Sequence, residues 1–144
     1  MRVMTRRFGE LEVADNEIIT FPRGILGFEE VRQYVLLEGS GPFGFLQAID
    51  EPDLTFVVVD PRVIVPKYRI EVARHVVGEI GIEDVNEAVV LTIVTIPAEP
   101  RNMTINLQAP LLVNSSNGQA KQVVLTDHGY DLRHPVFGAV GQSA

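Results

Sequence analysis

The feature that most narrows the possible folds is a high content of stiff, β-branched side chains, interrupted by residues that reverse the chain. The 144 residues include 21 valines and 11 isoleucines, together with nine prolines and 12 glycines. β-Branched residues favour strands, and proline and glycine at short intervals end them. The sequence therefore predicts a mainly β protein that is built from many short strands.

Two segments, residues 54–59 and 89–96, are apolar at both odd and even positions, which is typical of strands buried on both faces. Residues 103–113 alternate between apolar and other side chains and predict a strand with one buried face. Pro110 marks a bulge, an edge or a break in that strand. An Asn-Gly turn within residues 115–118 and a return strand over 122–125 predict a hairpin.

The apolar spacing of residues 71–80 predicts an amphipathic helix, and a shorter helical turn is expected over 28–33. Together these patterns predict a small closed or partly open antiparallel β-barrel with one or two short helices. Weaker strands are expected over residues 2–8, 11–13, 18–21, 34–37 and 45–49.

The length is that of one domain, so we expect residues 1–137 to form it and residues 138–144 to be a flexible tail. The basic start is not followed by the apolar core of a secretory signal, and no window has the roughly 20 apolar residues of a membrane span. The absence of cysteine excludes a disulfide framework and a thiolate metal site. We therefore expect a cytoplasmic protein with no membrane partner.

The net charge is −7 and the isoelectric point is near 4.9. Non-specific affinity for nucleic acid depends on basic surface, so we expect no direct nucleic-acid partner. Electrostatic steering by such a chain favours a basic partner, although an acidic balance also serves solubility alone.

No motif in the chain requires an enzyme. The serines lie outside any Gly-x-Ser-x-Gly pattern, and there is no Walker sequence or Gly-x-Gly-x-x-Gly pattern. Asp127, His128, Asp131 and His134 lie close in sequence, but the histidine spacing matches no standard zinc pattern. We therefore expect no catalytic residue, no metal and no cofactor. A small β-barrel that binds a ligand or a metal through residues 127–134 is the alternative function.

Two groups of residues stand out as candidates for function. Aromatic side chains in apparent loops either form an interaction site or fold back to plug one end of the barrel. They are Phe21, Phe28, Phe43 and Phe45. A second group, Asp50, Glu51 and Asp53, forms an acidic turn, which is most simply a solvated turn and alternatively a paired acid and base.

Four segments that together span nearly the whole length form a recognisable pattern. They are residues 18–29, which contain Phe-Pro-Arg-Gly-Ile-Leu-Gly-Phe-Glu, residues 46–61, residues 93–97 with 103–110, and residues 130–135, which read Tyr-Asp-Leu-Arg-His-Pro. In these segments the chain resembles the FliW family of flagellar assembly factors. Leu26 stands where the family usually has proline, and the stretch 71–76 is less acidic than the family's version.

The resemblance implies a β-barrel-like protein without catalytic activity that binds two partners in turn. Members of the family bind flagellin in the cytoplasm. Once flagellin is exported, the freed factor captures the small basic RNA-binding regulator CsrA, away from its RNA-contacting surface, and relieves repression of flagellin translation. The apolar terminal segments of flagellin require a hydrophobic groove, for which Phe21, Phe28, Phe43 and Phe45 are the candidates. The candidates for CsrA are Asp50, Glu51 and Asp53.

Overall fold

A computed structural model of the chain describes residues 1–126 and 129–137. The expected tail, residues 138–144, lies outside the described residues. None of the helices in the described part has the length and apolar character that crossing a membrane requires. The strands are β1 (Arg2–Thr5), β2 (Gly9–Glu12), β3 (Ile18–Thr20), β4 (Gln33–Glu38), β5 (Phe43–Ala48), β6 (Thr55–Val59), β7 (Val89–Thr95), β8 (Thr104–Ile105), β9 (Leu111–Val113), β10 (Ala120–Gln122) and β11 (His134–Pro135). The helices are α1 (Pro61–Ile64) and α2 (Arg74–Gly78), with single 3₁₀ turns η1 (Asp15–Glu17), η2 (Val85–Glu87) and η3 (Pro100–Asn102).

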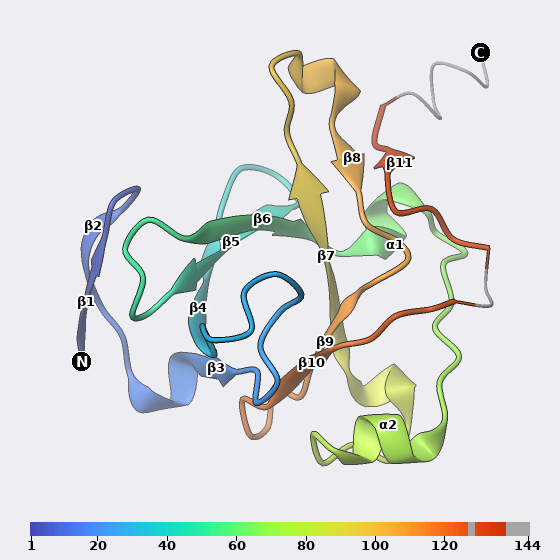
Figure 1. Cartoon of the computed structure of the whole chain (residues 1–144), viewed down its shortest axis with the longest axis horizontal. Coiled ribbons are helices and arrows are strands. Elements are labelled where there is room, and N and C mark those ends of the chain that lie inside the picture. The colour runs from blue at the N-terminus through green and yellow to red at the C-terminus, as the bar shows by residue number, and fades with distance from the viewer. Residues whose placement is uncertain (127–128, 138–144) are drawn as a thin grey trace.

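Antiparallel pairing joins seven strands in the order β10-β9-β7-β6-β5-β4-β3, and β8 and β11 extend the sheet beside β7 (Figure 1). The two ends of this path meet at one isolated bridge between Thr20 and Gln119, where the Thr20 N–H donates to Gly118 O at 2.8 Å. No ladder continues the bridge between the described strands, so the sheet curls into a partly open β-barrel. The predicted fold class is confirmed.

The central strands are buried on both faces, as the apolar runs predict. On one face lies the loop-side cluster, in which Val58 and Leu91 pack with residues of the 21–32 loop. On the other face lies the helix-side cluster, in which Val59 and Val90 pack with Tyr68 and with residues of the α2 region. Burial on both faces explains why β6 and β7 show no alternation of apolar and polar residues.

The loop formed by residues 21–32 crosses the centre of the ring of strands (Figure 1). It contains successive turns and no helix, so the helical turn expected over 28–33 is wrong. Gly24 has φ +69°, and a Cβ at this position would lie 2.5 Å from Glu29 Cα. Only glycine fits such a close approach of two chain segments. Phe21 and Ile25 point inward from this loop into the loop-side cluster.

The long strand predicted over 103–113 is interrupted. Asn106 Oδ1 accepts hydrogen bonds from the backbone N–H of Gln108 (3.1 Å) and Ala109 (3.0 Å). This Asx turn bends the chain away from the extended form, so β8 and β9 are separate strands that both pair with β7. The predicted hairpin is confirmed, with β9 paired to β10, but its return strand is Ala120–Gln122 and not 122–125.

The predicted helix over 71–80 is shorter than its apolar spacing suggests. Ala73 has ψ 149°, so the helix begins only at Arg74. The helix ends at Gly78, and glycine has low helix propensity. Val77 and Ile80 still pack in the helix-side cluster.

The N-terminal strands β1 and β2 form a separate antiparallel hairpin at one side of the molecule (Figure 1). Val3 and Val13 from this hairpin region pack against Val35 and Ile49. The hairpin therefore covers one flank of the barrel without joining its sheet.

Candidate functional site

A groove of about 310 Å³ lies where the 21–32 loop, the sheet and the C-terminal segment converge. Its size is near the small end of the roughly 300–1,000 Å³ that is usual for binding pockets, so it accommodates a few side chains. We call it the apolar groove. It is lined by Ile25, Leu26, Phe56, Ile93, Thr95, Asn106, Gln108, Ala109, Gln122, Val124, Leu132 and Arg133.

The groove has a rigid base. Ile93 and Thr95 are two residues apart on β7 and therefore face the same side, and Phe56 comes from the neighbouring strand β6. The Asx turn at Asn106 brings Gln108 and Ala109 beside them. The interruption of the predicted strand thus shapes one side of the groove.

Gln122 on β10 connects two sides of the apolar groove. Its Oε1 accepts a hydrogen bond from the Leu26 N–H at 2.8 Å, and its Nε2 donates to Ala109 O at 3.2 Å. One side-chain amide therefore holds the 21–32 loop at a fixed distance from the Asx turn.

The C-terminal side of the groove is held by hydrogen bonds from segments distant in sequence. The Leu107 N–H donates to Asp131 O at 3.0 Å, and the Arg69 N–H donates to the Tyr130 hydroxyl oxygen at 3.0 Å. The Tyr130 ring also packs on Tyr68, with centroids 4.6 Å apart. These contacts position the adjacent Leu132 and Arg133.

The rim of the groove presents apolar side chains to solvent. Leu26 is 61% exposed, Val124 50% and Leu132 56%. A cluster of exposed apolar residues around a concave surface marks a protein-interaction site more often than isolated exposed residues do. The arrangement can bind apolar side chains of a partner segment.

A three-residue ion-pair group fixes the start of the 21–32 loop. Glu79, next to α2, lies 2.8 Å from Arg23 and 2.6 Å from Lys121. The hydrogen bond from Lys121 lowers the pKa of Glu79, and the positive charges of Lys121 and Arg23 add to this effect. Because the folded-state pKa is lowered, these pairs stabilise the fold above the ordinary carboxyl pKa, and the contribution is lost as pH falls through the lowered value.

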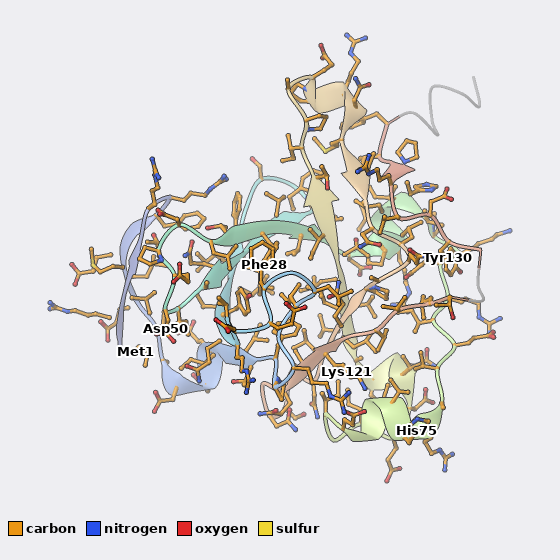
Figure 2. All side chains as sticks on the ribbon, viewed as in Figure 1. Met1, Phe28, Asp50, His75, Lys121 and Tyr130 are labelled. Carbon is orange, nitrogen blue, oxygen red and sulfur yellow. The ribbon has the colours of Figure 1, made fainter. Side chains whose placement is uncertain are left out.

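Of the four predicted phenylalanines, two lie in the 21–32 loop. Phe21 is fully buried in the loop-side cluster, in edge-to-face contact with Tyr34, so its assignment to a binding surface is corrected: it is a core residue. Phe28 is 41% exposed, and its ring meets Phe56, part of the groove lining, at a centroid distance of 5.2 Å. Figure 2 shows Phe28 near the centre of the view.

Phe43 and Phe45 lie in strand β5; the sequence suggested a loop at Phe43, whereas Phe45 is the first residue of the strand expected over 45–49. Phe43 packs against the helix-side cluster. Phe45 is covered by the N-terminal hairpin, with the Phe8 ring 5.2 Å away and the Arg7 guanidinium 5.1 Å above its ring. Neither of them lines the apolar groove.

The acidic residues Asp50, Glu51 and Asp53 are all exposed in the turn between β5 and β6. The Arg6 guanidinium of the N-terminal hairpin lies 3.6 Å from the Asp53 carboxylate. The backbone N–H of Arg6 donates a hydrogen bond to Pro52 O at 2.9 Å. The hairpin therefore neutralises part of the acidic turn. In Figure 2, Asp50 lies toward the N-terminal hairpin, on the opposite side of the view from Tyr130.

The residues proposed for a metal site are only partly described. Asp127 and His128 lie outside the described residues, and His134 lies in β11. Within residues 1–126 and 129–137, no three His, Asp or Glu side chains cluster as metal ligands would.

Sequence reasoning missed the exposed apolar residues of the groove, which are Leu26, Val124 and Leu132, together with Arg133. They come from segments far apart in the chain, and none has a periodic pattern. The available signal was that Leu26, Leu132 and Arg133 stand within the segments that resemble the FliW family.

The model of the FliW protein family matches residues 2–136 of the chain. A flagellar assembly factor FliW from Thermoanaerobacter pseudethanolicus is 38% identical over 140 residues, covering 95% of this chain and 93% of that protein. One from Geobacter sulfurreducens is 39% identical over 145 residues, with 99% and 91% covered, and one from Heliobacterium modesticaldum is 41% identical over 141 residues, with 96% and 92% covered.

A crystal structure of the flagellar assembly factor FliW superposes with a TM-score of 0.89 at 32% sequence identity, covering 95% of this chain and 97% of that chain. Sequence and fold therefore agree over nearly the full length of the described residues. The chain belongs to the FliW family, whose relatives reported above are named flagellar assembly factors.

Proposed function

We propose that this protein is a non-enzymatic flagellar assembly factor that binds cytoplasmic flagellin in the apolar groove. When flagellin is exported, the freed protein binds a CsrA-type regulator and relieves its repression of flagellin synthesis. Both activities are binding equilibria, so the protein acts by exchanging partners.

The observation that carries the proposal is the convergence of the family-like segments on one concave surface. Leu26 comes from the first segment, Phe56 from the second, Ile93 and Ala109 from the third, and Leu132 from the last. Leu26 and Leu132 are the exposed residues among these five, and packing of the core does not require either of them to lie at the rim of a groove. Family membership together with this convergence supports the groove as the flagellin site.

The physical need of the partner matches the chemistry of the groove. Apolar segments that are buried only in an assembled filament must be covered while the subunit is free, because exposed apolar patches lead to aggregation. Transfer of such side chains into the groove contributes roughly 25 cal/mol for each Å² of apolar surface removed from water. Phe28 extends the same surface through its contact with Phe56.

For the regulator, the proposed contact is the acidic turn of Asp50, Glu51 and Asp53. Asp53 is already paired with Arg6, so Asp50 and Glu51 carry most of the charge that a basic partner would meet. This turn lies outside the lining of the apolar groove. Flagellin and the regulator are therefore proposed to use different surfaces.

The test is binding of purified monomeric flagellin to matched pairs of variants. Val124→Asp and Leu132→Asp place a charge in the groove, whereas Val63→Asp and Leu36→Asp place the same charge on exposed apolar residues outside it. We expect both groove variants to bind flagellin at least about tenfold more weakly, because a desolvated carboxylate replaces an apolar contact.

The control variants should bind within about twofold of the original protein, and circular dichroism should show all four folded. Groove variants that are folded and bind flagellin normally would refute the groove as the flagellin site.

A further inference from the structure

Arg133 is the single charged residue among those that line the apolar groove in the described part of the chain. It is exposed, and within residues 1–126 and 129–137 no carboxylate lies within ion-pair distance of it. Several other arginines do have such a partner: Arg2 pairs with Glu10, Arg23 with Glu79, and Arg101 with Glu99. Arg133 therefore presents a positive charge at the edge of an otherwise uncharged surface.

This placement is notable in a protein of net charge −7. The long-range field of the chain repels acidic segments, but at contact distance a guanidinium beside apolar side chains attracts a carboxylate. Charges at the rim of an interface act mainly on partner choice and register. Guanidinium also binds a carboxylate through two parallel hydrogen bonds, which fixes its orientation.

We propose that the segment bound in the apolar groove carries a carboxylate next to its apolar side chains, and that Arg133 pairs with this carboxylate and sets the register of the segment. This inference rests on the proposed function, because it describes the flagellin segment that the groove accepts. Apolar contacts with Leu26, Val124 and Leu132 supply affinity, and Arg133 selects which apolar segment is accepted.

A nucleic-acid phosphate is the competing anion. A phosphate backbone presents closely spaced charges, and its affinity comes from several cations that act together. One arginine on a strongly acidic protein does not meet that requirement. The groove lining is also largely apolar, which suits a peptide.

The probe is purified monomeric flagellin, titrated calorimetrically at low and high ionic strength. Arg133→Gln removes the charge, Arg133→Lys keeps it without the two-point geometry, and Arg133→Glu reverses it. Arg101→Glu is the matched control, because it changes the net charge equally at an exposed residue outside the groove. We expect about a twofold to tenfold loss of affinity for Arg133→Gln, a larger loss for Arg133→Glu, an intermediate value for Arg133→Lys, and little change for Arg101→Glu.

The partner carboxylate is then found by changing the acidic residues of the bound flagellin segment to lysine one at a time. One such change should restore binding to Arg133→Glu while weakening binding to the original protein. If Arg133→Glu binds like Arg101→Glu, or if no flagellin position restores binding, the inference is wrong.

The Leu132→Asp variant separates failure of this inference from failure of the proposed function. If Leu132→Asp loses binding and Arg133→Glu does not, only the selective role of Arg133 is lost. If both bind normally, the groove itself is not the flagellin site.

Discussion

Gln122 links two sides of the apolar groove through hydrogen bonds of its side-chain amide. It is partly buried, and its amide reaches the Leu26 N–H on one side and Ala109 O on the other. The Gln122 side chain contributes modestly to stability, but it sets the separation between the 21–32 loop and the Asx turn. Its loss should therefore weaken the proposed binding of flagellin more than it lowers the stability of the fold.

Gln122→Ala tests that role. Two hydrogen bonds of about 1 kcal/mol each are removed, so the free energy of unfolding should fall by about 1–2 kcal/mol. Flagellin affinity should fall by about threefold to tenfold, because the 21–32 loop is no longer fixed beside the Asx turn. Gln33→Ala, at an exposed strand position outside the groove, is the control and should change neither quantity. Denaturant unfolding measures the change in stability, and calorimetric titration measures the change in flagellin affinity. Unchanged flagellin affinity in Gln122→Ala would contradict the proposed role of Gln122.

Reasoning from single residues in the sequence did not predict which side chains are exposed. Phe21 and Phe28 look alike in sequence, seven positions apart in one loop, yet one is fully buried and the other is partly exposed. The loop reverses at Gly24, which turns Phe21 inward, and no local pattern encodes that reversal. Residue type predicts that a phenylalanine prefers burial, but only the tertiary structure decides which ring is left outside.

At the scale of elements, the strands that sequence predicted best are those that pack against core residues on both faces. The runs over 54–59 and 89–96 became β6 and β7, because β-branched side chains packed on both faces leave few alternatives. The predicted strand over 103–113 failed where Asn106 bonds to the backbone two and three residues ahead. A side chain that competes locally for backbone N–H groups can interrupt an otherwise regular alternation.

The contact between β3 and the turn before β10 holds the ends of the barrel together, and Gly118 makes this contact possible. Gly118 has φ +73°, and a Cβ there would lie 2.6 Å from Ile18 O. Its carbonyl accepts the Thr20 N–H that bridges the two ends of the sheet.

Gly118→Ala should therefore destabilise the protein by roughly 3 kcal/mol, of which about 1–2 kcal/mol comes from the left-handed backbone and the rest from the steric clash. Gly9→Ala is the matched control, because Gly9 has φ +70° but a Cβ added there would meet nothing within 4 Å. Gly9→Ala should therefore lose only the roughly 1–2 kcal/mol of stability that comes from the left-handed backbone. Denaturant unfolding of both variants measures the difference. Equal losses would mean that the close approach to Ile18 does not limit this position.

At the scale of the whole molecule, the candidate surfaces are supported by different parts of the fold. The groove depends on the 21–32 loop, the Asx turn and the C-terminal segment, whereas the acidic turn joins β5 to β6 and contacts the N-terminal hairpin. Sequence placed the acidic turn correctly because it lies within one short segment. It could not assemble the groove, because lining residues such as Leu26, Val124 and Leu132 meet only through the curl of the sheet.

Net charge is also a property of the whole molecule, and it predicts how the proposed antagonism of a basic RNA-binding regulator should respond to salt. In the proposed mechanism, the net charge of −7 attracts the basic regulator, and the bound protein repels RNA phosphates without occupying the RNA site. Surface charges are screened over a Debye length of about 8 Å at physiological salt and of about 3 Å at 1 M. The association rate with the regulator should therefore fall by about tenfold or more between low and high ionic strength, and inhibition of RNA binding should fall with it.

Neutralising the acidic turn should reproduce part of this loss without added salt. We expect Asp50→Asn with Glu51→Gln to slow association with the regulator by severalfold, whereas Asp84→Asn with Glu83→Gln, an exposed acidic pair elsewhere, should change it only through the shared loss of net charge. Stopped-flow association and RNA competition measure both effects across ionic strength. Inhibition that is equally strong at low and high salt would mean that apolar contacts, and not charge, carry the antagonism. Identical rates for the two double variants would place the contact away from the β5–β6 turn, because long-range steering depends on total charge and a bound contact depends on position.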